Sequence, residues 1–467
     1  MIRTTVTENG KVRGLAADDP RVTIFRGIPF AAPPVGENRW RAPQPAENWE
    51  GVRECFEFGP ISMQDVPGVG SDLYCREWHV DPDIPMGEDS LYLNIWTGAN
   101  DASEKLPVLV WIYGGAFQWG YTAEMEFNGE RLARHGIVVV SIAYRLGAFG
   151  FLAHDELTKE DEEHPTNFGL LDQQAAISWV YRNIASFGGD PDNITLGGQS
   201  AGGASVMYAL ANPDVAPMIK KATIFSGLIR NPFYTDDVIQ PKNISEMAQS
   251  GKQFIEYIGC ASVEEARSVD AVTIRDAYDK YAKDHLRFVP CIDGKFIKED
   301  AYDLKLSGRF PDIPILTGYT ADEFPDKLPA DADLTKAGFR ADIIEKGGIR
   351  YFNVVQNSVR SAASAHFEHS MTAPMYVYGF GPDIPGYDHP GAFHSCDLWF
   401  FFETIQKCWR PYTGMHYALA RRMCDYWTNF IRKGDPNGEG YDGNILPEWK
   451  KISSADPAKD EIFFDKI

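Results

Sequence analysis

Ser200 is the residue of this chain whose surroundings most favour covalent chemistry. It lies in the segment 197–203, Gly-Gly-Gln-Ser-Ala-Gly-Gly, between a strand-like run at 193–196 and a helix-like run that begins near Ala201. Glycines on both sides relieve the crowding of a sharp strand-to-helix turn, and such a turn exposes the serine hydroxyl as a nucleophile. The backbone amide of Ala201, at the helix start, would point to where a carbonyl oxygen becomes an oxyanion.

The pattern G-x-S-x-G is weak evidence by itself, because a chain of this length and glycine content has roughly a one in five expectation of a chance match. The alternative is an ordinary tight glycine turn. A second glycine cluster supports the catalytic interpretation, because the apolar run 106–113 ends in Gly114, Gly115 and Ala116. Such a loop suits backbone amides that turn inward to a bound oxygen. Two loops of this kind favour a nucleophile elbow.

With these motifs the chain resembles the type B carboxylesterases, a family of α/β-hydrolases that includes the cholinesterases. Matching motifs occur in the family's order over nearly the whole chain, at residues 25–31, 88–94, 114–117, 144–147, 167–173, 187–191 and 197–203. The resemblance implies a serine carboxylic-ester hydrolase that acts on a small-molecule ester through an acyl-enzyme.

The triad acid and base are expected downstream of Ser200, because this fold supplies them in the order serine, acid, histidine. Glu323 follows the strand-like run 313–318 in a segment that resembles the family's acid motif, and the neighbouring Asp322 is its competitor. His394 lies in a segment, 391–399, that resembles the one carrying the family's catalytic imidazole. His389 is the alternative base.

These residue types explain how ester hydrolysis proceeds at neutral pH. His394 would accept the Ser200 proton during attack and return it to the leaving alkoxide. Glu323 would hold the imidazole in the required tautomer and stabilise the imidazolium. The oxyanion would be bound by the backbone amides of Gly115, Ala116 and Ala201. This chemistry requires no metal and no organic cofactor.

Departures from the family pattern bear on the substrate. Residue 199 is glutamine where many members have glutamate, and the loop 62–90 does not match the choline-binding motif, so acetylcholine is an unfavourable substrate. Phe233, His285 and Leu286 fall where related enzymes line the acyl pocket, which suggests small to medium apolar or aromatic esters. The same three residues could equally belong to the general core.

Several other functions use the same residues. An amidase, a thioesterase or a lipase shares the triad, and feruloyl and acetyl-sugar esters remain open as substrates. Some cholinesterase-like domains are binding modules that lack the catalytic serine. Because Ser200, Glu323 and His394 are all present, the sequence favours an enzyme over a binding module.

Alternating strand-like and helix-like runs predict the scaffold that positions these residues. They indicate an α/β-hydrolase fold over residues 1–467, a single domain with a mostly parallel, doubly wound sheet. The stretch of about 212–305 interrupts the alternation and is expected to be a helical cap insertion. Strand-like runs lie at 108–113, 137–143, 193–196, 221–225 and 313–317, and helix-like runs at 170–184, 201–210 and 415–432.

Composition excludes some partners and suggests a compartment. The formal net charge of −21 disfavours nucleic acid and anionic membrane surfaces, and no apolar run is long enough to span a membrane. The first residues read as a strand and turn, not as a signal peptide. Secreted relatives carry a disulfide where this chain has Ser62 and Ser90, and its seven cysteines show no paired spacing, so we expect a cytoplasmic protein. The sequence gives no indication of oligomeric state.

Overall fold

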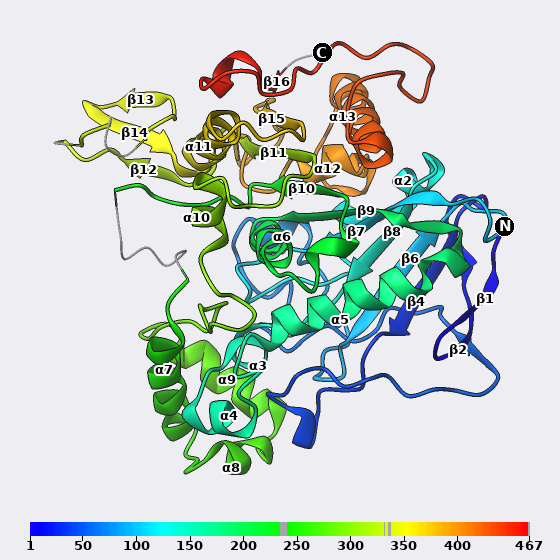
Figure 1. Ribbon diagram of the computed structural model, residues 1–467, viewed down its shortest axis with the longest axis vertical. Coiled ribbons are helices and arrows are strands. Elements are labelled where there is room, and N and C mark those ends of the chain that lie inside the picture. The colour runs from blue at the N-terminus through cyan, green and yellow to red at the C-terminus, as the bar shows by residue number, and fades with distance from the viewer. Residues whose placement is uncertain (234–240, 331, 335–337, 466–467) are drawn as a thin grey trace.

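A ten-stranded sheet forms the centre of the molecule in the computed structural model, which describes residues 1–233, 241–330, 332–334 and 338–465 (Figure 1). In order across the sheet, the strands are β16 (Ile462–Phe464), β15 (Met375–Phe380), β11 (Ile315–Thr320), β10 (Lys221–Phe225), β9 (Gly189–Gln199), β7 (Leu106–Ile112), β8 (Val138–Ile142), β6 (Tyr92–Thr97), β4 (Thr23–Pro29) and β3 (Leu15–Ala16).

Seven of these strands, from β16 to β8, run parallel, and the prediction of a mostly parallel sheet is confirmed. Strands β6, β4 and β3 add an antiparallel edge next to β8. Every residue of β8, β10, β11 and β15 is buried, as expected of parallel strands covered on both faces.

Strand β9 is longer than the sequence indicates. The apolar run predicts a strand at 193–196, but β9 begins at Gly189, where Leu106 of β7 pairs with it before an irregularity in register. The segment 189–192 is Gly-Asp-Pro-Asp, which reads as a turn by composition. Backbone pairing with β7 overrides that local preference.

Helices cover both faces of the sheet. Helix α6 (Ala201–Ala211) packs against β9 and β10 on one face, and α5 (Phe168–Asn183) packs beside α6. Helix α13 (Gly414–Lys433) packs against β7 and β9 on the other face, together with α12 (Leu398–Phe401). Figure 1 shows the sheet between these two groups. The three helices that the sequence predicts are thus present.

The segment 212–305 contains β10 and then mainly helix: α7 (Ile244–Tyr257), α8 (Val263–Arg267), α9 (Ala271–Tyr281) and the start of α10 (Ala301–Leu306). Side chains at their N-termini bind the free amides there, since Asn243 forms a capping box with Glu246 and Asp270 accepts from the amides of residues 272 and 273. Helices α7, α8 and α9 gather at one end of the molecule with α3 (Gly147–Phe151) and α4 (Asp155–Glu160) (Figure 1).

Two small sheets lie outside the ten-stranded sheet. A small sheet of β12 (Pro325–Lys327), β14 (Ile349–Asn353) and β13 (Ile343–Lys346) precedes α11 (Val354–Glu368), and the sequence analysis did not foresee it. A second small sheet joins β1 (Thr4–Thr7), β2 (Gly10–Arg13) and β5 (Val52–Glu54). Short helices α1 (Tyr74–Glu77) and α2 (Glu130–Arg134) complete the set.

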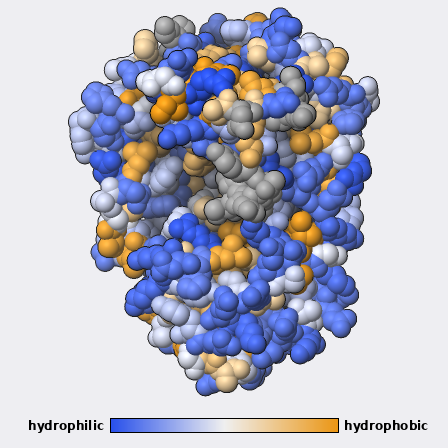
Figure 2. Space-filling model, turned by 90° about the vertical axis from the view of Figure 1, so that its left-hand side faces the viewer, coloured by the Kyte–Doolittle hydropathy of each residue, from blue (hydrophilic) through white to orange (hydrophobic). Residues whose placement is uncertain are grey.

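The surface is largely hydrophilic (Figure 2). Hydrophilic side chains dominate the face in Figure 2, and apolar residues form small, separated groups around a central hollow. Within the described ranges, no helix has the length and apolar character needed to cross a membrane.

Candidate active site

Four loops meet at the carboxyl edge of the parallel strands. The glycine loop follows β7, Ser200 follows β9, Glu323 follows β11 and His394 follows β15 after a longer connection. Strand order reverses between β8, β7 and β9, and ligands of open α/β sheets bind at such a reversal, outside the carboxyl ends of the strands. Topology therefore brings together residues that are nearly 200 positions apart.

Ser200 occupies a strained backbone position between β9 and α6. Its φ is 55° and its ψ is −124°, and its amide donates to the carbonyl of Phe225 at 2.9 Å. The flanking glycines are required by space, because a Cβ at Gly198 would lie 2.4 Å from the backbone of Gly202, and one at Gly202 would lie 2.1 Å from the carbonyl oxygen of Ile112. Close contact between backbones holds the serine on its sharp turn.

The backbone amides of Gly115, Ala116 and Ala201 have no hydrogen-bond acceptor among the described residues. Gly115 has φ 103° and Ala116 has φ 53°, so the loop turns back on itself directly after β7. At Gly115 a Cβ would lie 2.2 Å from the carbonyl oxygen of Trp119, so only glycine fits. Gly115, Ala116 and Ser200 line one cavity, and Ala116, Ser200 and Ala201 line a second, so all three residues border a cavity that also contains the serine.

Glu323 is buried, with 1 % of its surface exposed, and one of its carboxylate oxygens contacts Nδ1 of His394. Its other oxygen accepts hydrogen bonds from Ser226 Oγ at 2.9 Å and from the amide of Thr320 at 2.8 Å. These two donors fix the carboxylate, which in turn orients the imidazole so that Nε2 is the nitrogen left for chemistry.

The competing residues lie elsewhere. The carboxylate of Asp322 accepts a hydrogen bond from the amide of Ala392 at 2.8 Å, two residues before His394. Asp322 therefore contacts the backbone of the histidine loop and not the imidazole. His389 is exposed at the surface.

Gln199 occupies the free side of the imidazole. Its side-chain nitrogen lies 3.1 Å from Nε2 of His394, and no hydrogen bond joins Ser200 to His394 among the described residues. Because Nδ1 faces the Glu323 carboxylate, Nε2 carries the lone pair and the Gln199 amide donates to it. The sequence shows only that a negative charge is missing at this position, whereas the contact itself depends on the elbow geometry.

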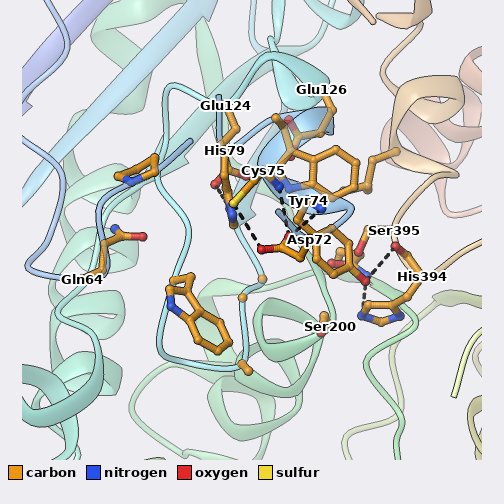
Figure 3. A pocket seen from close by; sticks show the side chains of 18 of the residues that line it. Gln64, Asp72, Tyr74, Cys75, His79, Glu124, Glu126, Ser200, His394 and Ser395 are labelled. Carbon is orange, nitrogen blue, oxygen red and sulfur yellow. Dashed lines mark hydrogen bonds and ion pairs between the residues drawn. The ribbon is translucent and has the colours of Figure 1, made fainter. Parts of the chain in front are cut away.

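Two cavities meet at the serine and share the walls Ala116, Ser200 and Phe324. The larger, about 460 Å³, contains His394 and the aromatic side chains of Tyr74 and Trp78. Figure 3 shows Ser200 and His394 toward one end of this cavity. The smaller, about 290 Å³, has an apolar wall from α6 and the segments after β10 and before α10: Met207, Leu228, Ile229 and Val289.

The three residues expected in an acyl pocket do not line either cavity. Phe233 packs against Phe339 and Phe352 in a satellite apolar cluster. The ring of His285 stacks on Tyr281, with ring centroids 4.1 Å apart, and Leu286 packs at the edge of the core. Sequence position alone could not place them, because near neighbours of these residues, among them Ile229 and Val289, line the smaller cavity while their own side chains pack elsewhere.

A buried acidic group in the larger cavity escaped the sequence analysis. Glu124 accepts hydrogen bonds from Nε2 of His79 at 2.8 Å and from the amide of Tyr121 at 3.0 Å. Burial, together with the adjacent Glu124, raises the pKa of Glu126 well above its ordinary value. Burial disfavours the imidazolium of His79, but the Glu124 carboxylate more than offsets this effect and raises the pKa of His79. Alternating polar and apolar residues at 124–127 gave no signal for this pairing.

Asp397 is a second buried acid, three residues after His394. The Tyr378 hydroxyl donates to it at 2.5 Å, and its other oxygen has no partner among the described residues. Burial is the main cause that raises the pKa of Asp397 to about 7; the nearby Glu323 also raises it, while the Tyr378 hydrogen bond lowers it.

Ser62 and Ser90 contact each other in the folded chain. Their hydroxyl oxygens lie 3.0 Å apart, and Ser62 also donates to the carbonyl of Tyr144 at 2.7 Å. All seven cysteines have free thiols.

His135, Glu403 and Cys424 form a group with metal-ligand atoms within 4.8 Å of one another, at a distance in the fold from Ser200. Burial and the neighbouring Arg432, Arg134 and Arg131 lower the pKa of His135 to about 4. This concentration of guanidinium groups opposes a bound cation.

Known proteins resemble this chain over almost its whole length. A sequence model of the carboxylesterase family matches residues 2–343 and 349–463. A para-nitrobenzyl esterase of Bacillus subtilis is 32 % identical over 93 % of this chain and 90 % of its own, and a human cocaine esterase is 31 % identical over 96 % and 85 %. Among solved structures, the carboxylesterase of Geobacillus stearothermophilus is similar with a TM-score of 0.74 and 30 % identity, covering 96 % of this chain and 94 % of its own.

Proposed function

This chain belongs to the carboxylesterase family and is a carboxylic ester hydrolase of α/β-hydrolase fold, and we propose that Ser200, His394 and Glu323 are its catalytic triad. The observation that carries the proposal is the contact of Glu323 with Nδ1 of His394, in a cavity that also exposes Ser200. Asp322 and His389 lack these contacts.

The chemistry follows from this geometry. Nε2 of His394 exchanges the Gln199 amide for the Ser200 hydroxyl, and Oγ then attacks the ester carbonyl as its proton passes to Nε2. The amides of Gly115, Ala116 and Ala201 bind the oxyanion; the loss of one such donor in comparable enzymes costs about 3 to 4 kcal/mol.

The tetrahedral intermediate breaks its bond to the alkoxide, which takes the proton from Nε2 and leaves as the alcohol. Water then attacks the acyl-enzyme with His394 as base, and the carboxylic acid is released with Oγ protonated again. These steps need no further reactant.

Each of the two cavities would hold a different part of the ester substrate. The leaving alkoxide must lie near Nε2, so the alcohol occupies the cavity of about 460 Å³ that contains His394. The acyl group then occupies the cavity of about 290 Å³, beside the amide of Ala201. Tyr74 and Trp78 favour an aromatic alcohol, in line with the para-nitrobenzyl ester in the name of one relative. We take small to medium apolar or aromatic esters as the substrate class.

Ser200→Ala tests this proposal. It should abolish the burst and the turnover of 4-nitrophenyl acetate, and a fluorophosphonate should label the wild-type chain at Ser200 alone, as located by peptide mass spectrometry. A label elsewhere, or turnover in the variant, would refute the triad. A panel of ester, amide and thioester with one acyl group separates an esterase from an amidase or a thioesterase.

Two further assignments belong to the same proposal. We take residues 212–305 as a helical cap insertion within one domain, since α7, α8 and α9 gather at one end of the molecule. We take the cytoplasm as the compartment, because the hydrogen bond between Ser62 and Ser90 replaces a disulfide of secreted relatives.

A further inference from the structure

One carboxyl oxygen of Glu126 lacks a hydrogen-bond partner among the described residues, in the cavity of about 460 Å³ assigned above to the alcohol, here called the alcohol cavity. The side chain lines that cavity with only 1 % of its surface exposed, and its Oε2 has no hydrogen-bond partner among the described residues. A buried polar atom without a partner destabilises a protein by about 1 to 3 kcal/mol, so a retained one calls for an explanation.

The other acids of the cavity already have partners. Asp65 accepts from the indole nitrogen of Trp119 at 2.8 Å. Asp72 accepts from the amide of Tyr74 at 2.8 Å, and from the thiol and the amide of Cys75.

Glu124 has partners as well, because its Oε1 accepts from His79 and from the amide of Tyr121. Among the four carboxyl groups that line the cavity, Glu126 is the one that has a fully buried oxygen without a hydrogen-bond partner among the described residues.

The surroundings define what that oxygen can bind. A carboxyl oxygen that carries no proton accepts a hydrogen bond, so a ligand bound to Oε2 in that state must present an O–H or an N–H. No Lys or Arg is among the described residues that line the cavity, and the imidazole of His79 is paired with Glu124. Figure 3 shows Glu126, Glu124 and His79 together, away from Ser200 and His394, which places them where the remote part of an alcohol would lie.

We propose that Glu126, supported by Glu124 and His79, forms a subsite for a hydrogen-bond donor, a hydroxyl or a primary ammonium, on the alcohol part of the ester. The inference rests on the proposed function, because the proton returned by His394 is what assigns this cavity to the alcohol. Tyr74 and Trp78 supply flat walls for the carbon skeleton between the ester and the donor.

A hydroxyl and an ammonium would require different protonation states of Glu126. When Glu126 is protonated and Glu124 is paired with protonated His79, the group is neutral and suits a hydroxyl. An ammonium ion would instead bind Glu126 as a carboxylate, with a charge-assisted hydrogen bond. Trimethylated ammonium has no N–H and would gain nothing from this oxygen.

Matched benzyl acetates test the subsite. Three substrates differ at one position: 4-ethylbenzyl, 4-(hydroxymethyl)benzyl and 4-(aminomethyl)benzyl acetate. In the wild type, kcat/KM for at least one donor-bearing ester should exceed that for the ethyl ester by about tenfold, equivalent to one good hydrogen bond. A gain with only the hydroxyl or only the ammonium identifies the source of the donor.

Variants assign the effect to Glu126. In Glu126→Leu the ratio of donor-bearing to ethyl ester should fall to about one or below, since the acceptor is gone. Glu126→Gln keeps an acceptor oxygen without the charge, so it should retain preference for the hydroxyl and lose preference for the ammonium. Each ratio is taken within one preparation, which cancels the amount of folded enzyme. Glu264→Leu, a control at a side chain that is 83 % exposed on α8, should keep the wild-type ratio.

The outcomes separate this inference from the triad. No advantage for either donor in the wild type, or an advantage that persists in Glu126→Leu, overturns the subsite while hydrolysis of the ethyl ester still supports the triad. Turnover of all three esters by Ser200→Ala would overturn the triad itself.

Discussion

The side-chain nitrogen of Gln199 lies 3.1 Å from Nε2 of His394, the atom that takes the Ser200 proton in the proposed mechanism. The amide and the serine hydroxyl therefore compete for one lone pair. Because the amide is neutral, this position adds no charge to stabilise the imidazolium, unlike a carboxylate. The residue before the nucleophile thus affects both the availability of the base and its proton affinity.

Gln199→Glu should shift the acid limb of the kcat/KM profile to higher pH by about one unit, because a carboxylate next to Nε2 favours the protonated imidazole. The profile is measured with an acetate ester whose alcohol does not titrate. Gln199→Leu removes the donor without adding charge and should leave the midpoint of the limb nearly unchanged. Equal midpoints in the Glu and Leu variants would contradict this account.

Glu323→Gln should lower kcat by about a hundredfold to ten-thousandfold, since the amide would favour the wrong imidazole tautomer. Asp322→Asn should lower kcat by less than about tenfold, because Asp322 bonds the backbone of Ala392 and the amide keeps an acceptor oxygen. Steady-state rates and near-UV circular dichroism of both variants check this order. A reversed order would make Asp322 the triad acid.

Relative to the wild type, the free energy of unfolding of Asp397→Asn should be higher at pH 8 than at pH 5. In the folded state, burial raises the pKa of Asp397 to about 7, so the protonated form contributes stability that is present below the unfolded value and is lost as pH rises through 7. The asparagine does not titrate. Between pH 5 and 7 the stability of the wild type should fall relative to the variant by about 2 kcal/mol at most.

Thermal unfolding at the two pH values measures this effect as a change in the Tm difference between wild type and variant. A Tm difference that stays constant from pH 5 to pH 8 would show that Asp397 has the same protonation state in the folded and unfolded chains.

The double variant Ser62→Cys and Ser90→Cys should form a disulfide, because the two hydroxyl oxygens are 3.0 Å apart. Closing the loop between them should raise the free energy of unfolding by about 3 kcal/mol through loss of entropy in the unfolded chain. Tm of the oxidised and reduced forms, with thiol titration, measures the gain. Ser62→Cys alone is the control and should respond to oxidant without stabilisation. A bridge that forms without raising Tm would indicate a strained geometry.

The sequence predicts those features of the fold and of the candidate site that depend on residues close together in the chain. Ser200 and Glu323 lie in motifs directly after strands, and His394 lies in a recognisable motif of its own. The apolar runs of β7, β8 and β10 predict their own strands, so these features could be found along the chain. Strand β9 extends past its apolar run because its partner β7 pairs with it, which is a tertiary effect.

The residues that line the cavities could not be predicted from the sequence, because they come from distant segments of the chain. Phe233 was expected at the acyl group, but its ring packs on Phe339 and Phe352, more than 100 positions away. Glu124 and His79 meet across separate segments of the chain, and no residue pattern displays this pairing or the burial that raises the pKa of Glu126. Motifs locate reacting atoms, whereas specificity arises from distant segments that happen to share a wall.

The two cavities that share the walls at Ser200 also bear on the fate of the acyl-enzyme. Once the alcohol has left, the acyl group stays in the smaller cavity while the larger one stands open beside Nε2 of His394. Water and a second alcohol reach the acyl carbon from that same side and are deprotonated by the same base. Hydrolysis and transesterification therefore differ only in which molecule fills the larger cavity, and a well-bound acceptor alcohol would turn this hydrolase into an acyltransferase.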